Sequence, residues 1–264
     1  MKNTIKLLLL VFITVINSCG NEDENSIVNH VANKKPKTIE YENRIICSFS
    51  YTNDNKLSQI INYYNNDIVT YDISYSGNEL TDCVYNKYTA DPDAGFVNTK
   101  FEKVTRNKIL ATIISPEQTN SIYAIILNDK GLPIKINLED GISVENDYEF
   151  FYYPNSSIIH QIRRSNKYST STYTYEYDNK SGMMCNINTP IWFIMFHQEI
   201  ISVEFVNNFM SYINNCVKVT EVSRGSSGSS YTDIVYDLQY TYDNDNFPIS
   251  IVDPLRDDFF TINY

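Results

Sequence analysis

The feature that most constrains this chain is a short unit that repeats along it. Each unit has an aromatic or apolar run, a turn rich in Asn, Asp or Gly, and a second apolar run. Aromatic and β-branched residues favour half-buried strands, and Asn, Asp and Gly form the tight turns that reverse a chain. The clearest unit is QYTYDNDNFPISI, which covers Gln239–Ile251. Each unit therefore predicts a β-hairpin.

Five further clear units and one weaker unit precede it, and together they cover most of the chain. The clear units are Phe49–Ile60, Tyr71–Cys83, Ile122–Ile136, Tyr148–Ile162 and Tyr173–Ile187, and the weaker one is Lys103–Ile114. The spacing leaves no room for the crossovers that parallel strands need. The sequence predicts a mainly all-β fold, a curved antiparallel meander sheet or open half-barrel of repeated hairpins. We expect a single domain over residues 38–264.

The repeat is interrupted once, between Thr189 and Asn215. An intensely apolar run, Pro190–Phe196, is followed by apolar residues at three- or four-residue intervals, which is helical spacing. The stretch Ile201–Phe205 also alternates like a strand. We expect one short helical excursion around residues 190–213 that covers the sheet, followed by a strand pair joined by a Ser- and Gly-rich loop.

The N-terminus has the pattern of a signal peptide over residues 1–18. Two lysines precede the apolar run Leu7–Ile16, which is far shorter than the about 20 residues that a membrane-spanning helix needs. The following Ile16-Asn17-Ser18-Cys19 resembles a bacterial lipobox, from which Asn17 departs. An ordinary signal peptide with an incidental cysteine is the alternative. We expect lipidation of Cys19.

The segment that follows, residues 19–37, reads as a lipidated N-terminus and a flexible acidic or polar tether. Its acids Glu22, Asp23 and Glu24 resemble the surface-export signal of Bacteroidota lipoproteins, although a tether without an address has the same composition. We expect a lipid-anchored protein of the outer membrane, at the cell surface or otherwise on the periplasmic face.

The charge of the chain argues against nucleic acid as a partner. The formal net charge is −11, and loss of Lys2 and Lys6 with the signal peptide would make it −13. Nucleic-acid phosphates require a basic footprint, and anionic lipid would repel this chain. We therefore expect contact with the membrane through the lipid anchor only.

The pattern Tyr-x-Tyr-Asp-x-x-x-x-Pro-x-x-Ile of Tyr240–Ile251, with its degenerate copies, resembles YD-type (RHS-like) repeats. More narrowly, the chain is similar to an uncharacterised Bacteroidota lipoprotein family with the same hairpins behind a lipobox. The resemblance covers most of residues 40–264. It implies a β-structured envelope protein but no activity. The cargo-enclosing shells of long YD-repeat proteins need many more copies.

Four cysteines follow Cys19, and an oxidising compartment permits disulfides between them. They are Cys47, Cys83, Cys185 and Cys216. Three pairings are possible, and the sequence does not choose among them. Buried thiols are equally compatible, because cysteine packs as a small hydrophobic residue.

No pattern for a metal or a cofactor is present. The histidines His30, His160 and His197 do not have zinc-site spacing, and the chain has no phosphate-binding loop or nucleophile elbow. Acid–amide turns at Asn53–Asn55, Asp178-Asn179 and Asp243–Asn246 carry oxygen ligands, but the last fails the spacing of a calcium loop. Hairpin turns explain these residues without an ion.

Two sets of side chains remain as candidates for a site. Glu199, Glu204 and the pair Glu139-Asp140 could supply the two carboxylates of a glycoside hydrolase, although each is also compatible with a solvated position. Trp192, Phe193 and Phe196 could line a ligand pocket. The alternative for these aromatic residues is that they fill the core.

These observations favour a non-catalytic binding or structural accessory module whose partner is a glycan or a protein. A second hypothesis is a carrier that holds an apolar ligand or a lipoprotein in a cavity of the curved sheet. A glycan-acting hydrolase is the third, and it requires paired carboxylates in a cleft.

Overall fold

The computed structural model describes residues 33–64, 67–88, 96–115, 120–139, 147–201 and 212–264. These residues form one sheet of 17 strands and a short helical segment. The strands are β1 (Thr38–Tyr41), β2 (Arg44–Tyr51), β3 (Leu57–Tyr64), β4 (Asp67–Ser76), β5 (Glu79–Tyr88), β6 (Phe96–Thr105), β7 (Lys108–Ile114), β8 (Ser121–Leu127), β9 (Pro133–Leu138), β10 (Asp147–Tyr152), β11 (Ile159–Ser165), β12 (Ser169–Tyr177), β13 (Cys216–Gly225), β14 (Ser230–Asp237), β15 (Gln239–Tyr242), β16 (Pro248–Asp253) and β17 (Asp258–Asn263), with the helix α2 (Ile191–Phe196) and the π-helical turn η1 (His197–Ile201) between β12 and β13.

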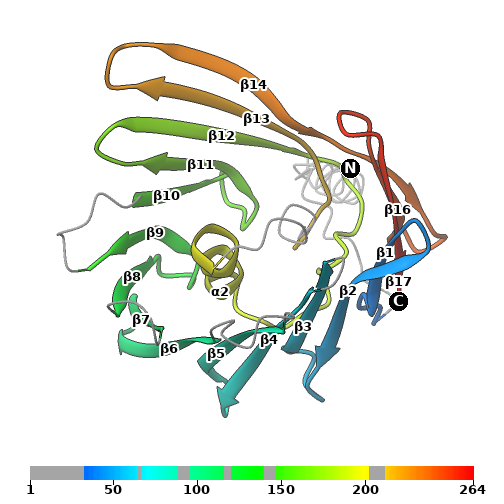
Figure 1. Ribbon diagram of the computed structural model, residues 1–264, viewed down its shortest axis with the longest axis horizontal. Helices are drawn as coiled ribbons and strands as arrows, with labels where there is room; N and C mark the ends of the chain where they lie inside the picture. The colour runs from blue at the N-terminus through cyan, green and yellow to red at the C-terminus, as the bar shows by residue number, and fades with distance from the viewer. Residues whose placement is uncertain (1–32, 65–66, 89–95, 116–119, 140–146, 202–211) are drawn as a thin grey trace, which may run out of the picture.

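The sheet is an antiparallel meander that curves into a nearly closed ring around α2 (Figure 1). From β2 to β14, each strand pairs with its neighbour in sequence. The predicted fold class, a mainly all-β curved meander of hairpins with one short helical excursion, is confirmed. The sheet curves further than a half-barrel.

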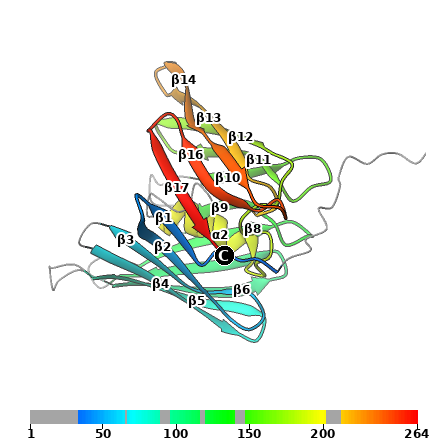
Figure 2. The same ribbon diagram turned by 90° about the vertical axis from the view of Figure 1, so that its right-hand side faces the viewer.

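Two connections bring the ends of the meander together. The first strand, β1, pairs with β2 on one side and with β17 on the other, so it joins the start of the sheet to its end (Figure 2). At the other end, β14 continues through Leu238 into β15. The first part of this run, β14, pairs with β13, the preceding strand of the meander. Its second part, β15, pairs with β16. The run therefore connects the meander to the C-terminal strands of the sheet. The Leu238 amide donates to the Val217 carbonyl at 2.7 Å where the strand changes partner.

Five of the six clear hairpin units, and the weaker one, form the predicted hairpins. They are β2–β3, β4–β5, β8–β9, β10–β11 and β15–β16, with β6–β7 as the weaker unit. In QYTYDNDNFPISI, Tyr240 lies opposite Ile251 and the turn contains Asn246 with φ 63°. The left-handed conformation explains the amide residue there, since Asn tolerates it better than most side chains.

The prediction of a hairpin at Tyr173–Ile187 is wrong. After β12 the chain leaves the sheet, and β12 pairs with β13, beginning at Cys216, instead. The Asp178 amide donates to the Asn215 carbonyl at 3.0 Å, so the chain leaves and re-enters the sheet at one place. Between these points Met183 and Met184 are buried in the core. Their hydrophobicity matched a return strand, but it serves burial inside the ring.

The segment between Asp178 and Asn215 fills space that the ring cannot fill by itself. A closed sheet of about eight strands is just filled by its own side chains, whereas 16–18 strands leave an open channel. Here Trp192, Phe193 and Phe196 of α2 are buried within the ring. The ring of Phe101 lies 5.3, 5.8 and 5.5 Å from the rings of these three residues. We call residues 178–201 and 212–215 the plug.

Hydrogen bonds fix the start of α2 against the β2–β3 hairpin. The buried Thr189 hydroxyl accepts from the Leu57 amide at 2.7 Å. The Asn188 amide donates to the Asn55 carbonyl at 2.9 Å, and its side chain donates to the Asp54 carbonyl at 2.6 Å. These bonds fix the residues immediately before α2, which has no side-chain cap of its own.

The described helical part of the plug runs from Ile191 to Ile201, as α2 followed directly by η1. Tyr212–Asn214, at the end of the predicted excursion, forms bends. Residues 202–211, which include the stretch that also alternates like a strand, lie outside the described residues. In the part of the chain that the structure describes, no helix has the length and apolar character needed to cross a bilayer.

The two faces of the ring differ in polarity. The inner face carries buried apolar side chains from most strands, such as Ile60, Ile125 and Ile162. The outer face carries cross-strand ion pairs, among them Arg163–Glu149 at 2.9 Å and Lys135–Asp147 at 3.0 Å. This alternation along each strand follows from the period of two in a pleated sheet.

The end of the segment assigned to the tether is fastened to the ring. The Lys34 ammonium contacts Asp243 and Asp245, each at 2.6 Å, in the β15–β16 turn. The Lys37 amide donates to the Asn263 carbonyl at 2.7 Å. Residues 34–37 therefore contact the domain rather than extending from it.

We expect Phe193→Ala to destabilise the protein by about 3–5 kcal/mol, because it removes a fully buried ring from the centre of the plug. The matched control is Phe259→Ala, since that ring is 54% exposed and should cost well under 1 kcal/mol. Urea unfolding measures both free energies. Equal effects of the two substitutions would contradict the role of the plug.

Candidate functional site

A pocket of about 440 Å³ opens at the end of the ring where α2 begins. The turns of the β4–β5, β6–β7 and β8–β9 hairpins surround it, together with Pro190 and Ile191. Its floor is formed by nearly buried apolar side chains from strands, turns and the plug. These are Leu80, Phe101, Ile109, Leu127, Leu132 and Trp192. We call it the end pocket.

Trp192 is the predicted ligand-lining residue that reaches this pocket. Its side chain lines the floor and is 8% exposed, with its ring 5.3 Å from that of Phe101. Phe193 and Phe196 are fully buried and pack against Phe101 from within the core. The structure thus separates the three aromatic residues into one that lines the pocket and two that support its floor.

The mouth of the end pocket is cationic. Lys103, Arg106 and Lys130 line it, against a single acid, Glu79. Lys103 pairs with Glu79 at 3.0 Å, and both side chains are at least half exposed. Among the described residues, the Arg106 guanidinium donates only to the backbone carbonyl of Asp129, at 3.5 Å. The mouth therefore has a positive excess in a chain whose net charge is −11.

Hydrogen bonds hold the turns that carry these cations. The Leu127 amide donates to the Asn107 carbonyl at 2.9 Å, which ties the β8–β9 hairpin to the β6–β7 turn. The Asn128 side chain accepts from the amides of Lys130 and Leu132 at 2.9 and 3.1 Å. Gly131 has φ 77°, a backbone conformation that residues other than Gly and Asn rarely adopt. The backbone of the mouth is therefore ordered before any ligand binds.

Glu199 lies inside the ring, away from the end pocket. Burial raises the pKa of this carboxyl from 4.5 to about 7, and the nearby Arg164 guanidinium and the Gln198 side chain oppose the rise. The Tyr148 hydroxyl donates to the Glu199 carbonyl at 3.0 Å and holds this part of η1 in place. No carboxylate pairs with it among the described residues, and Glu204 lies outside them.

The other acids named from the sequence have protein partners. Glu139 forms an ion pair with Lys108 at 2.5 Å, and Asp140 lies outside the described residues. Asp54 pairs with Lys56 at 2.7 Å. Asp178 accepts hydrogen bonds from Asn215 and Tyr242.

The structure places the histidines and cysteines named from the sequence at separate positions. The described part of the chain contains no cluster of His, Cys, Asp and Glu that could hold a metal ion. His160 lies in β11 and His197 packs edge-on against Tyr71 at 4.5 Å, whereas His30 is outside the described residues. The structure records Cys47, Cys83, Cys185 and Cys216 as thiols rather than disulfides. Burial raises the pKa of each thiol, which makes it a poor nucleophile.

The sequence alone did not reveal the cations at the mouth. Arg106 lay in the turn of the weakest hairpin unit, and Lys130 lay in another turn 24 positions further on. Only the strand order shows that these two turns are neighbours at one end of the ring. An excess of basic over acidic residues in turns at the same end could have indicated the site once the meander was assumed.

Comparison with protein-family models gave no match, and a search of curated protein sequences also gave none. Two solved structures resemble the chain. A porin-like protein from Bacteroides vulgatus is 10% identical, with a TM-score of 0.42 over 88% of this chain and 98% of its own. A porin-like protein from Bacteroides uniformis is 14% identical, with a TM-score of 0.38 over 86% and 97%.

The raised pKa of Glu199 predicts that the protein loses stability as the pH rises from about 4.5 to about 7. In that range the folded protein holds a proton that the unfolded chain releases, so deprotonation at higher pH favours unfolding. Glu199→Gln stays uncharged and should be more stable than the original protein at pH 8, by on the order of 1–3 kcal/mol.

Thermal unfolding at pH 4.5 and pH 8 measures this difference, which should almost vanish at the lower pH. Glu102→Gln, on the exposed outer face of β6, is the control and should show no comparable pH dependence. An advantage of Glu199→Gln that is equal at both pH values would contradict the assignment.

Proposed function

We propose that this protein is a non-catalytic binding protein of the cell envelope. It is held to the outer membrane by lipid on Cys19, and it binds in the end pocket an amphipathic molecule with an apolar body and an anionic group. The observation that carries the proposal is the pairing of an apolar floor around Trp192 with cations at the mouth.

The size and chemistry of the end pocket support this ligand class. Small-molecule sites are concave, mostly apolar and about 300–1,000 Å³ in volume, with a few polar groups that orient the ligand. An alkyl or aromatic body would replace water against Leu127, Leu132 and Trp192. A carboxylate, sulfate or phosphate at the mouth would meet Arg106 and Lys130, and a guanidinium can bind such a group through two hydrogen bonds.

Binding fits the described residues better than catalysis does. The hydrolase hypothesis requires two carboxylates at a defined separation. The end pocket contains only Glu79, which is exposed and paired with Lys103. The carrier hypothesis shares the apolar floor, but the end pocket opens directly at the surface and suits exchange of a small ligand rather than enclosure of a lipoprotein.

The polarity of the ring supports a water-facing protein that depends on a separate anchor. A sheet that faces lipid carries its apolar side chains outward. Here many apolar side chains point inward, and ion pairs such as Arg163–Glu149 occupy the outer face. Acyl chains on the N-terminal cysteine would supply the attachment, since stable anchoring takes more than one chain.

Trp192 makes the ligand proposal directly testable, because it is the single tryptophan of the chain. Titration with decanoate should change its fluorescence saturably. Arg106→Gln and Lys130→Gln should each weaken decanoate binding about 3- to 10-fold, which corresponds to the loss of one partly exposed charge interaction. Fluorescence titration of each variant measures the dissociation constant.

Decanol is the matched ligand without a charge, and its binding should be nearly the same in all variants. Lys87→Gln is the matched control, since Lys87 pairs with Asp67 and does not line the end pocket. A Trp192 signal that responds to neither ligand, or a decanoate affinity that both mouth substitutions leave unchanged, would rule out the proposed ligand class.

The proposed anchor is tested separately. Cells grown with radiolabelled palmitate should incorporate label into the protein, and Cys19→Ala should abolish the label and release the protein from the membrane fraction. Protease treatment of intact cells then distinguishes surface display from the periplasmic face. Retention of the unlabelled variant in the membrane fraction would show that Cys19 is not the anchor.

A further inference from the structure

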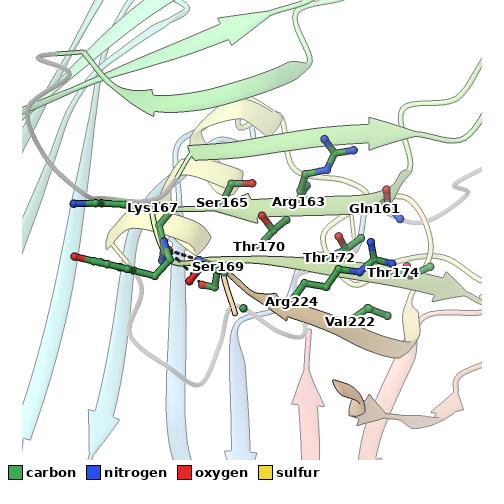
Figure 3. A pocket seen from close by; sticks show the side chains of 14 residues that line it. Gln161, Arg163, Ser165, Lys167, Ser169, Thr170, Thr172, Thr174, Val222 and Arg224 are labelled. Carbon is green, nitrogen blue, oxygen red and sulfur yellow. Dashed lines mark hydrogen bonds between the residues drawn. The ribbon is translucent and has the colours of Figure 1, made fainter. Parts of the chain in front are cut away.

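A second and larger hollow lies on the outer face of the ring, over β11, β12 and β13 (Figure 3). Its volume is about 780 Å³, and it extends from the strands to the β11–β12 turn. The plug and the end pocket contribute no side chains to it. We call it the outer hollow.

The register of the three strands determines which side chains face the outer hollow. Ile162 is buried on the inner face, so its neighbours Gln161 and Arg163 point outward. Arg163 pairs across with Thr172, which in turn lies opposite Val222. The next row of outward-facing residues, nearer the β11–β12 turn, contains Ser165, Thr170 and Arg224. Figure 3 shows the threonines on the middle strand, with Arg163 on one side and Arg224 on the other.

The chemistry of this surface is polar and positive. Arg163, Lys167 and Arg224 are among its 14 lining residues, and none of the 14 is an acid. Neighbouring strands lie about 4.8 Å apart, so the β11 and β13 backbones that carry the two arginines are separated by roughly 10 Å. That spacing places two cations along an extended ligand rather than around one small ion.

The two arginines differ in how they are held. Arg163 donates to Glu149 at 2.9 Å and lies 5.2 Å from the ring centre of Phe151, so its stem is oriented while other N–H groups remain available. Within the described residues, the Arg224 guanidinium has no hydrogen-bond or ion-pair partner of its own. Arg224 would therefore gain more than Arg163 from an anionic ligand, because its guanidinium would not have to leave a partner within the described residues.

Hydroxyl groups fill the space between the cations. Within the described chain, the side chains of Thr170, Thr172 and Thr174 make no hydrogen bond of their own. Each hydroxyl can donate one hydrogen bond and accept two. Tyr168, which is 61% exposed, adds an aromatic ring at the rim.

The rim is ordered by the two turns that form it. The Asn166 side chain accepts from the amides of Tyr168 and Ser169 at 2.8 and 2.9 Å. The Ser226 amide donates to the Tyr168 carbonyl at 2.8 Å and ties the β13–β14 turn to the β11–β12 turn. A ligand would therefore meet a surface that is already arranged, which lowers the entropy lost on binding.

We propose that the outer hollow binds an acidic polysaccharide segment, with its carboxylate or sulfate groups on Arg163 and Arg224 and its hydroxyls on the threonines between them. An acidic sugar chain presents both groups in alternation along an extended backbone. A simple polyanion offers only acceptors, so it would use the arginines and could accept from the hydroxyls, but it would leave their acceptor capacity unused. This site is independent of the end pocket.

The test is calorimetric titration of the full chain in detergent with trigalacturonate, a short carboxylated glycan, and with dextran oligomers as the neutral glycan. Trigalacturonate should bind and dextran should not. Arg224→Gln should weaken binding about 10-fold or more, since a charge-assisted hydrogen bond is lost. Arg44→Gln, an exposed arginine at the start of β2, is the matched control and should leave binding unchanged.

Thr172→Val and inorganic polyphosphate separate a glycan from a bare anion. Valine keeps the shape and the strand preference of threonine but removes the hydroxyl, which can both donate to and accept from a glycan but can only donate to polyphosphate. This variant should therefore weaken trigalacturonate several-fold and polyphosphate clearly less. Equal binding of polyphosphate and trigalacturonate, with no effect of Thr172→Val, would overturn the glycan assignment. Absence of trigalacturonate binding, or binding that Arg224→Gln does not weaken, would overturn the site. Neither result bears on decanoate at Trp192.

Discussion

The size of the ring is the constraint on which the rest of the structure depends. A curved sheet of 17 strands encloses more space than side chains on its inner face can fill. The chain fills that space with a segment of itself, whose aromatic residues meet Phe101 at the centre. Burial of these rings against the inner face supplies apolar contact that a hollow ring of the same strands would lack.

The plug also produces the end pocket, because α2 begins below the level of the surrounding turns. Its first apolar residues, Ile191 and Trp192, form a floor rather than a seal. Polar contacts set this depth: the buried Thr189 hydroxyl accepts from the Leu57 amide, and the Asn188 side chain donates to the Asp54 carbonyl in the turn before β3. A recess with an apolar floor and an ordered polar mouth is thus a consequence of where the plug is attached.

The sequence predicted most of the fold, because the strand and turn signals are local. The hairpins around Asn55, Gly77, Gly131 and Asn246 were readable from residues that tolerate positive φ. The unit at Tyr173–Ile187 misled because Met183 and Met184 have the hydrophobicity of a buried strand. Hydrophobicity alone does not distinguish a residue that is buried in a strand of the sheet from a residue that is buried inside the ring. Partner choice depends on contacts between Asp178 and Asn215, which are 37 positions apart.

The sites were less predictable than the fold for a related reason. Trp192 stood out because it is the single tryptophan and lies where the repeat is interrupted. The cations of both hollows did not stand out, since each comes from a separate hairpin and has an ordinary role in a turn or on a strand. Arg163 and Arg224 become neighbours only through the register of β11, β12 and β13. Pairing register is a property of the assembled sheet and is weakly encoded in any one strand.

The way in which the ring closes has a consequence for the order of folding. The strands from β2 to β12 need only local pairing, but β1 finds one of its two partners in β17, more than 200 positions away. The strand that joins the two ends, β14 with β15, also lies near the C-terminus. While the chain is synthesised from its N-terminus, the sheet would remain an open ribbon with two bare edges. The last residues to be synthesised convert it into a ring, so the slow, non-local step of folding falls after the rest of the sheet can already have formed.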